Sequence, residues 1–452
     1  MTWETTLAQL DEPARALLRL LAWLAPDPIP RALFRGAAAD QLFVTAVASP
    51  GDNERTSEVS LEEALAGLAK YAMVKWMDAT NASVQVHRLV QEITRGRLAE
   101  GERRFWLEQA LQLVDAAVPA EPPPDDIRSW PMWDGLRPHV AAVATQADQV
   151  AIAAPTARLL NELGLFLKTK CVFVEAESLY RRALAITEAA YGPTHPEVAI
   201  RLNNLAALLR ATNRLAEAEP LYRRALAIAE AADGPTHPEV AIRLNNLAVL
   251  LQDTNRLAEA EPLYRRALAI DEAAYGPMHP TVAICLNNFA MLLYNTNRLA
   301  EAESLHRRAL AIDEAAYGPM HPKVATGLSN LAVLLRATNR RVEAEPLYRH
   351  ALAIDEAAYG PTHPEVARDL NNLTLLLQDT NRLAEAEPWS GGPWPSMKWP
   401  TGRRDPMVAI HLNNLGGLLQ ATDRLAEAEP LYRRALVIDE AAYGPTHPRG
   451  GP

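Results

Sequence analysis

The chain has 452 residues, of which 49% are hydrophobic and 22% charged, a composition typical of a folded protein and not of a disordered segment. The formal net charge of −10 argues against nucleic acid as a partner, because binding to phosphates needs a basic surface. No uncharged apolar run reaches the roughly 18 residues that cross a membrane, the first residues do not resemble a signal peptide, and two cysteines fit a reducing compartment, which together predict a cytoplasmic protein with no membrane partner.

Residues 1–98 predict a small α+β domain. Ser60 and Glu63 form a capping box at the start of one of its helices. Residues 75–87 alternate between polar and apolar around a turn, which predicts a β-hairpin. The expected elements are, in order, helices over 7–24 and 31–34, a polar loop over 48–59, a helix over 60–74, the hairpin, and a helix that begins at His87.

Helices followed by a hairpin are typical of a winged helix. This order, and the phrase Val86-His87-Arg88-Leu89-Val90-Gln91, resemble the winged-helix portion of bacterial NB-ARC signalling ATPases of the STAND class. In that family a histidine at the place of His87 senses the phosphate of ADP. The nucleotide-binding part that precedes it there is missing here, so we expect His87 to cap its helix or to pack. Glu58, Glu62 and Asp78 leave no basic recognition helix for DNA.

Residues 99–154 predict a helical connector. Pro122–Pro124 break the helical pattern. Trp130, Met132 and Trp133 follow, and we expect them to pack against a neighbouring element.

A fixed period of 42 residues dominates the remainder of the chain. The string LNNLA begins at Leu202 and Leu244, and close variants begin at Leu286, Leu328, Leu370 and Leu412. A second string, RLAEAEPLYRRAL, recurs with the same period. They define seven repeats over 155–448, followed by a tail at 449–452: 155–196, 197–238, 239–280, 281–322, 323–364, 365–406 and 407–448.

Each repeat predicts two helices. In repeat two, Pro196 opens the first helix, and apolar residues then recur at steps of three and four. Asn213 suits a left-handed turn, and the second helix runs from about Leu215 to Gly234-Pro235. Pro220 lies inside that second helix, where it costs one backbone hydrogen bond.

The repeats resemble tetratricopeptide repeats of the 42-residue variety found in kinesin light chains and many bacterial regulators. The pattern of small and large residues carries the resemblance: Leu202, Leu205, Ala206, Leu209, Leu215, Ala218, Tyr222 and Ala225. The family often has glycine where this chain has Asn213. The resemblance implies a mostly α fold, a right-handed α-solenoid of about seven helix pairs, with a concave groove lined by the first helices that binds extended peptides or helices.

The second asparagine of each pair is the candidate binding residue. In the family this position faces the groove and holds the backbone of a bound peptide, a task that suits an amide because it both donates and accepts. The alternative is that these asparagines bond to neighbouring repeats. The candidates are Asn204, Asn246, Asn288, Asn330, Asn372 and Asn414, with Glu162 in the matching place of repeat one. Apolar residues lie beside them at Ile200, Ile242, Val249, Met291 and Val333.

Other polar groups predict structural roles. One histidine in each Gly-Pro-x-His-Pro linker cannot converge with the others on one metal ion, so we expect turns or helix caps. Glu217 and Glu219 predict a solvated face, and Cys171 and Cys285 predict small core residues. No phosphate-binding loop, nucleophile elbow or zinc-protease helix occurs, so we expect no catalytic residue, cofactor or metal.

Repeat six departs from the pattern, because residues 388–405 should form its second helix but are rich in proline and glycine. Three tryptophans lie there: Trp389, Trp394 and Trp399. Two compensating frameshifts, or a Trp-rich binding insertion, would explain the segment, and either predicts a weak joint. The end without a polar capping helix, and the missing front part, suggest a gene fragment.

The sequence thus predicts a non-enzymatic scaffold that binds protein partners, as part of a signalling regulator. The alternative is a fragment or subunit of a STAND-type ATPase whose nucleotide-binding domain is supplied upstream or in trans. A motor cargo adaptor is disfavoured, because residues 1–150 show no sustained heptads. The identity of the partner and the oligomeric state stay open.

Overall fold

The chain forms two compact units, Met1–Leu208 and Leu209–Pro452. The computed structural model describes residues 7, 9–34, 61–77, 82–118, 122–170, 172–361, 363–383 and 385, with single residues and short stretches between 413 and 436. The loop predicted over 48–59, the disrupted segment predicted over 388–405 and the tail at 449–452 lie outside the described residues.

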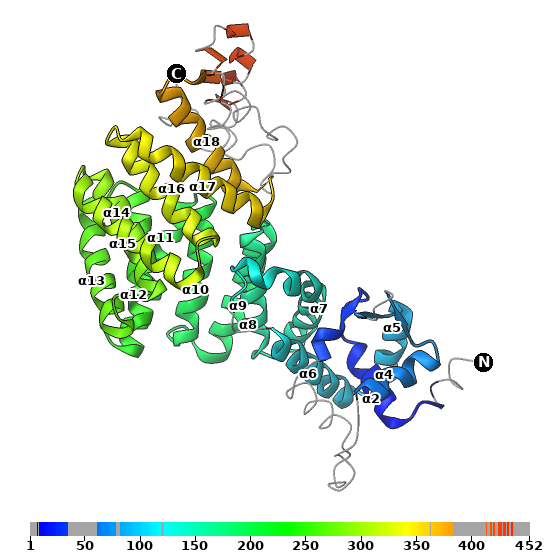
Figure 1. Ribbon diagram of the computed structural model, residues 1–452. Coiled ribbons are helices and arrows are strands. Elements are labelled where there is room, and N and C mark those ends of the chain that lie inside the picture. The colour runs from blue at the N-terminus through cyan, green and yellow to red at the C-terminus, as the bar shows by residue number, and fades with distance from the viewer. Residues whose placement is uncertain are drawn as a thin grey trace. The chain divides into compact units, whose positions relative to one another are not determined.

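The first unit begins with a small α+β region (Figure 1). Its first described helix follows Asp11, whose carboxylate accepts a hydrogen bond from the Ala14 N–H at 2.9 Å, and Pro13 lies in the first turn. The helix predicted over 7–24 is therefore confirmed in its central part. The elements are α2 (Glu12–Leu21), β1 (Ile29–Pro30), the 3₁₀ helix η1 (Arg31–Phe34), α4 (Leu61–Lys70), β2 (Val74–Trp76), β3 (Ser83–Val86) and α5 (Arg88–Arg97).

A three-stranded antiparallel sheet in the order β1-β3-β2 completes this region. The hairpin predicted over 75–87 is confirmed, since Trp76 lies opposite Val84 and Val74 opposite Val86. Strand β1 was not predicted, and its Ile29 pairs with Val84. Val84 and Val86 are fully buried and point to the same face, so that face carries the core.

Two long helices join this region to the repeats. They are α6 (Glu100–Ala117) and α7 (Trp130–Gln149), with the 3₁₀ helix η2 (Ile127–Ser129) between them. Trp133 is fully buried and stacks on Phe166 of the first repeat, with 5.6 Å between ring centroids. The expectation that Trp133 packs against a neighbouring element is confirmed.

Successive helix pairs make up the remainder of both units, as predicted. The first unit contains α8 (Thr156–Thr169), α9 (Phe173–Tyr191) and the start of α10 (Pro196–Ala211). The second unit continues with α11 (Leu215–Asp233), α12 (Pro238–Asp253), α13 (Leu257–Tyr275), α14 (Pro280–Asn295), α15 (Leu299–Tyr317), α16 (Pro322–Ala337), α17 (Arg341–Tyr359) and α18 (Pro364–Asp379).

Clusters of buried apolar residues join neighbouring helix pairs in the described part of the second unit. One cluster combines Ala229 of α11, Leu244 of α12, Ile270 of α13 and Cys285 of α14, and so spans three repeats. Cys285 is 1% exposed, which confirms it as a small core residue, whereas Cys171 lies outside the described residues. Shared burial of this kind explains why single pairs do not fold alone.

The first helices of successive repeats also contact one another directly, α12 with α14, α14 with α16, and α16 with α18. They form one face of the second unit, and the exposed side chains of this face therefore lie next to one another. Across the described residues, no helix combines the length and the apolar character needed to cross a bilayer.

Candidate functional site

In repeats two to six, an asparagine in the left-handed conformation lies between the first helix and the second. The φ angles of these residues lie between 57° and 63°, which confirms the predicted turn: Asn213, Asn255, Asn297, Asn339 and Asn381. Asparagine tolerates this conformation better than most residues with a side chain. The turn fixes the angle between the two helices, and so fixes which face of the first helix stays open.

The linker histidines cap the first helices. His237 Nδ1 accepts a hydrogen bond from the Glu239 N–H at 3.2 Å, and the same contact occurs at the other described linkers: His195, His279, His321 and His363. Most of these rings also stack on the tyrosine that ends the preceding helix, as Tyr275 does on His279 with 4.6 Å between centroids. The predicted cap role is confirmed, and His447 lies outside the described residues.

A stripe of partly exposed side chains runs along the first helices. On α12 the stripe holds Ile242, Asn246 and Val249, which are spaced four and three residues apart and so share one face. The residues between them are buried. We call the corresponding residues of the second unit the first-helix stripe: Ile242, Asn246 and Val249; Ile284, Asn288 and Met291; Thr326, Asn330 and Val333; Arg368, Asn372 and Leu375. In the first unit the same positions are Arg158, Glu162 and Leu165 on α8, and Ile200, Asn204 and Ala207 on α10.

Four of the six candidate asparagines thus lie half-buried at the centre of the first-helix stripe, and Asn204 is half-buried at the same place on α10 of the first unit. Asn414 lies outside the described residues. Two of them bond across repeats. Asn288 Nδ2 donates to Asn245 Oδ1 at 3.2 Å, and in the first unit Asn204 Nδ2 donates to Asn161 Oδ1 at 3.0 Å. These bonds match the structural alternative and hold the amides in a fixed orientation. Contact of the asparagines with a bound peptide stays a prediction.

The asparagine contacts change after repeat four. Asn287, the counterpart of Asn245, faces His306 of α15 with 3.0 Å between Oδ1 and Nδ1. Burial lowers the pKa of His306 to about 4, so the ring is neutral at pH 7. In repeat five the first asparagine is replaced by Ser329, which donates to Asp369 at 2.8 Å. The environment of Asn330 and Asn372 therefore differs from that of Asn246 and Asn288.

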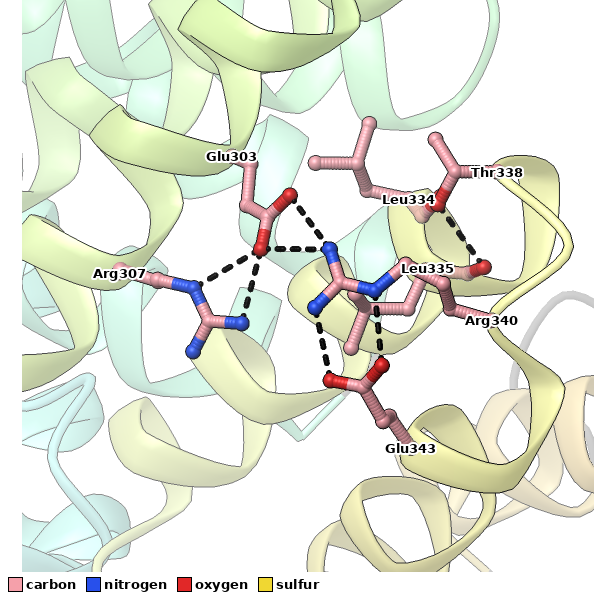
Figure 2. Close-up of polar contacts among 7 residues, drawn as sticks. All are labelled: Glu303, Arg307, Leu334, Leu335, Thr338, Arg340 and Glu343. Carbon is pink, nitrogen blue, oxygen red and sulfur yellow. Dashed lines mark hydrogen bonds and ion pairs between the residues drawn. The ribbon is translucent and has the colours of Figure 1, made fainter.

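A second series of contacts links the second helices. Arg340 lies directly after a left-handed turn and contacts Glu343 of its own helix at 2.7 Å and Glu303 of the preceding repeat at 2.8 Å; Arg307 contacts the same Glu303 (Figure 2). Arg256, Arg298 and Arg382 make equivalent contacts. Hydrogen bonds from Arg256 and Arg223 lower the pKa of Glu219. The prediction that Glu219 belongs to a merely solvated face is therefore wrong, because the residue joins two repeats.

Buried carboxylates occupy one position on three second helices. Asp271, Asp313 and Asp355 are 2%, 4% and 1% exposed, and burial raises their pKa to about 6, 7 and 8. Asp355 faces the fully buried Asp369 of α18, with Arg368 Nη2 3.8 Å from Asp355 and 3.6 Å from Asp369. The carboxylates lie in the joints between repeats, and Arg368, which belongs to the first-helix stripe, reaches from the stripe into the last of these joints.

The described part of the chain contains a cavity but no cluster of metal-ligating side chains. There, no three His, Cys, Asp or Glu side chains converge to hold a metal ion. A cavity of about 390 Å³ in the first unit is lined mainly by alanine and isoleucine side chains of α9 and the loop after α7. The one carboxylate in its lining, that of Asp148, forms an ion pair with Arg182 at 2.6 Å.

His87 caps α5. Its Nδ1 accepts a hydrogen bond from the Leu89 N–H at 3.2 Å. This confirms the predicted cap role, the same contact that the linker histidines make.

The sequence reasoning missed three exposed apolar residues around repeat four. They are Met278, Ile284 and Met320, which are 59%, 47% and 58% exposed. The signal that could have found them is a comparison of the repeats with one another, because most other linkers have threonine in place of the two methionines.

Comparisons with known families agree with this architecture. Two family descriptions named "Tetratricopeptide repeat" match the chain: one matches residues 155–231, 202–273, 239–315, 281–357 and 323–390, and the other matches 408–449. The first covers more than half of the 452 residues, so the chain belongs to the tetratricopeptide repeat family. Residues 5–103 match a "Domain of unknown function (DUF7779)". No curated protein matches the chain.

Several solved structures are similar to the chain. BtubC (BKLC) from P. vanneervenii is 25% identical, with 56% of this chain and 94% of that chain covered and a TM-score of 0.40. A STAND protein with a tetratricopeptide repeat sensor from Pyrococcus horikoshii is 13% identical, with 97% and 64% covered and a TM-score of 0.49. A Rap protein complexed with Competence and Sporulation Factor is 15% identical, with 78% and 92% covered and a TM-score of 0.50. The last likeness shows a shared fold.

Proposed function

We propose that the chain is a non-enzymatic scaffold that binds a partner peptide or protein along the first-helix stripe, in the concave groove expected for this family. The observation that carries the proposal is the stripe itself. On the first helices of consecutive repeats, a side-chain amide such as that of Asn246 or Asn288 lies between two positions that are mostly apolar. Amides can bond the backbone of an extended peptide, and apolar side chains beside them can take its side chains.

We further propose that this scaffold is the part of a cytoplasmic signalling regulator that senses a ligand or binds an effector. The Rap protein of similar fold was solved with a factor bound, which is the kind of role meant here. In this proposal residues 1–98 are a winged-helix-like domain, 99–154 a connector and 155–448 the seven repeats.

A triple variant tests the binding role. Partners captured by the full chain from an extract of its source cells are identified and purified, and their affinity for the chain is measured by calorimetry. Asn246→Ala/Asn288→Ala/Asn330→Ala should weaken binding about tenfold or more, since each change removes a side-chain donor and acceptor for the bound backbone.

The matched control changes three exposed arginines of the second helices, Arg265→Ala/Arg307→Ala/Arg349→Ala, which should leave the affinity within about twofold. Both variants are compared with the parent chain by circular dichroism. Equal affinity of the asparagine variant and the parent chain would show that the stripe is not the binding surface.

The alternative is a fragment or subunit of a STAND-type ATPase. The order of elements in residues 1–98 and the phrase around His87 favour it. Binding of ADP or ATP by the full chain, or a neighbouring reading frame that encodes a phosphate-binding loop, would support this alternative over a free-standing scaffold.

A further inference from the structure

Helix α14 differs from every other first helix described in the structure, because it has no charged residue. On α12 the first turn carries Glu239, which pairs with the buried Arg243 at 2.8 Å. The same two places on α14 hold Thr281 and Cys285. The ion pair that flanks the stripe in repeat three is thus absent from repeat four.

The stripe is more open at this helix than on α12, and it is more apolar than on α16 and α18. Ile284 is exposed, with 47% of its surface open to solvent, whereas Ile242 at the same place on α12 is less exposed and only partly accessible. Thr326 and Arg368 take this place in repeats five and six. Met291 lies on the other side of Asn288 and is half-buried. An aliphatic pair therefore flanks the central amide of α14.

Exposed methionines lie in the two linkers that lead into α14 and α16. Met278 is 59% exposed and Met320 is 58% exposed. The equivalent residues of two earlier linkers are Thr194 and Thr236. Because α14 and α16 contact one another, both methionines lie near the N-terminal end of the same pair of helices. Methionine side chains adapt their shape to an apolar partner.

The fold does not require these apolar side chains. The repeats are close copies of one another, so the same position in a neighbouring repeat shows which residue the helix pair needs. At the place of Ile284, repeats two and three also carry isoleucine, but repeats five and six carry Thr326 and Arg368, and the linkers without methionine carry threonine. Met278, Ile284 and Met320 are each about half exposed to solvent. Burial in the core therefore does not explain why these three residues are apolar.

Building on the binding role proposed above, we infer that repeat four is the anchor site of the stripe and takes one bulky, uncharged side chain of a partner peptide. Leucine, methionine and phenylalanine have this chemistry. The anchor packs against Ile284 and Met291, with Met278 and Met320 at the edge. A charged side chain in this place would lose part of its water without meeting an opposite charge on α14 itself.

Selection from a phage-displayed library of random ten-residue peptides on the full chain provides the probes. Peptides that share one bulky apolar residue are synthesised, and their dissociation constants are measured by fluorescence anisotropy. Ile284→Glu should raise the dissociation constant about tenfold or more, and so should exchange of the peptide's anchor for lysine. The matched control is Val342→Glu on α17, at a site that is 90% exposed and lies outside the first-helix stripe. It should change the constant less than about threefold.

A more conservative substitution controls for the possibility that Ile284→Glu disturbs the fold. Ile284→Thr introduces the residue that repeat five already carries at this place. Combined with exchange of the anchor for alanine, it should show less than additive losses, because both changes remove the same contact. Strictly additive losses would place the anchor elsewhere.

The remaining outcomes separate the two proposals. Selected peptides that share a charged residue, or that bind the Ile284→Glu variant as tightly as the parent chain, overturn the anchor site and leave the binding role in place. A concentration-dependent dimer that Ile284→Glu abolishes would assign the surface to a second copy of the chain and also overturn it. Failure to select any peptide on the parent chain contradicts both proposals.

Discussion

At the scale of the residue, a few side chains with unusual local roles set the geometry of every repeat. Asn297 adopts a φ of 60° between α14 and α15, and His279 caps α14 through its ring nitrogen. Both roles depend only on neighbours within a few residues, so the sequence could predict them. The contact between Arg256 and Glu219 spans 37 residues and depends on how repeats stack, which explains why a reading of one helix missed it.

The left-handed conformation of the turn asparagines leads to a prediction for substitutions of Asn297. Asn297→Val should lower the local free energy of unfolding of α14 and α15 by about 1–2 kcal/mol, because a β-branched residue is strained at positive φ. Asn297→Gly should change it by less than about 0.5 kcal/mol, since glycine adopts this conformation without strain. Hydrogen exchange of the α14 and α15 amides measures both. Equal exchange rates in the valine and glycine variants would contradict the role given to the turn.

At the scale of the element, the joints between repeats combine an apolar core with buried carboxylates. Asp355 of α17 and Asp369 of α18 face one another across the joint between repeats five and six. Helical periodicity placed both on helices but could not reveal that they meet, since they belong to different repeats. Periodicity likewise located the stripe but not the greater exposure of Ile284 on it.

The buried carboxylates predict that the repeats lose stability as the pH rises from about 4 to 8. Asp271, Asp313 and Asp355 have pKa values raised to about 6, 7 and 8, against about 3.9 in an unfolded chain. Between the two pKa values the folded chain binds more protons than the unfolded chain. Each group therefore lowers the free energy of unfolding as the pH rises through the window between its two pKa values, and the loss ends above its folded pKa.

Thermal unfolding of the full chain between pH 5 and pH 8 measures this effect. The triple variant Asp271→Asn/Asp313→Asn/Asp355→Asn should show a flatter dependence of Tm on pH than the parent chain, because asparagine does not ionise. The difference between the two chains isolates the carboxylates from histidine caps, which the variant retains. Parallel curves for the two chains would show that these groups do not control the joints.

At the scale of the whole molecule, the tetratricopeptide repeat architecture could be predicted, because a 42-residue period repeats the same local signals many times. The small α+β region could be predicted from the spacing of its apolar residues and from the alternation in its hairpin. Strand β1 could not be predicted, since two residues that include Pro30 carry no periodic signal. The most informative differences are those between near-identical repeats. Among the repeats that the structure describes, they single out repeat four, whose first helix has no charged residue and the most exposed stripe residue, Ile284.

The account depends most on the claim that a partner lies against the first helices. A selected peptide that carries photo-leucine at its anchor position, irradiated with the full chain and analysed by mass spectrometry, tests this claim directly. We predict crosslinks to the first-helix stripe, chiefly between Ile284 and Met291 of α14. Crosslinks confined to the second helices, such as α13 and α15, or to residues 9–118, would contradict it.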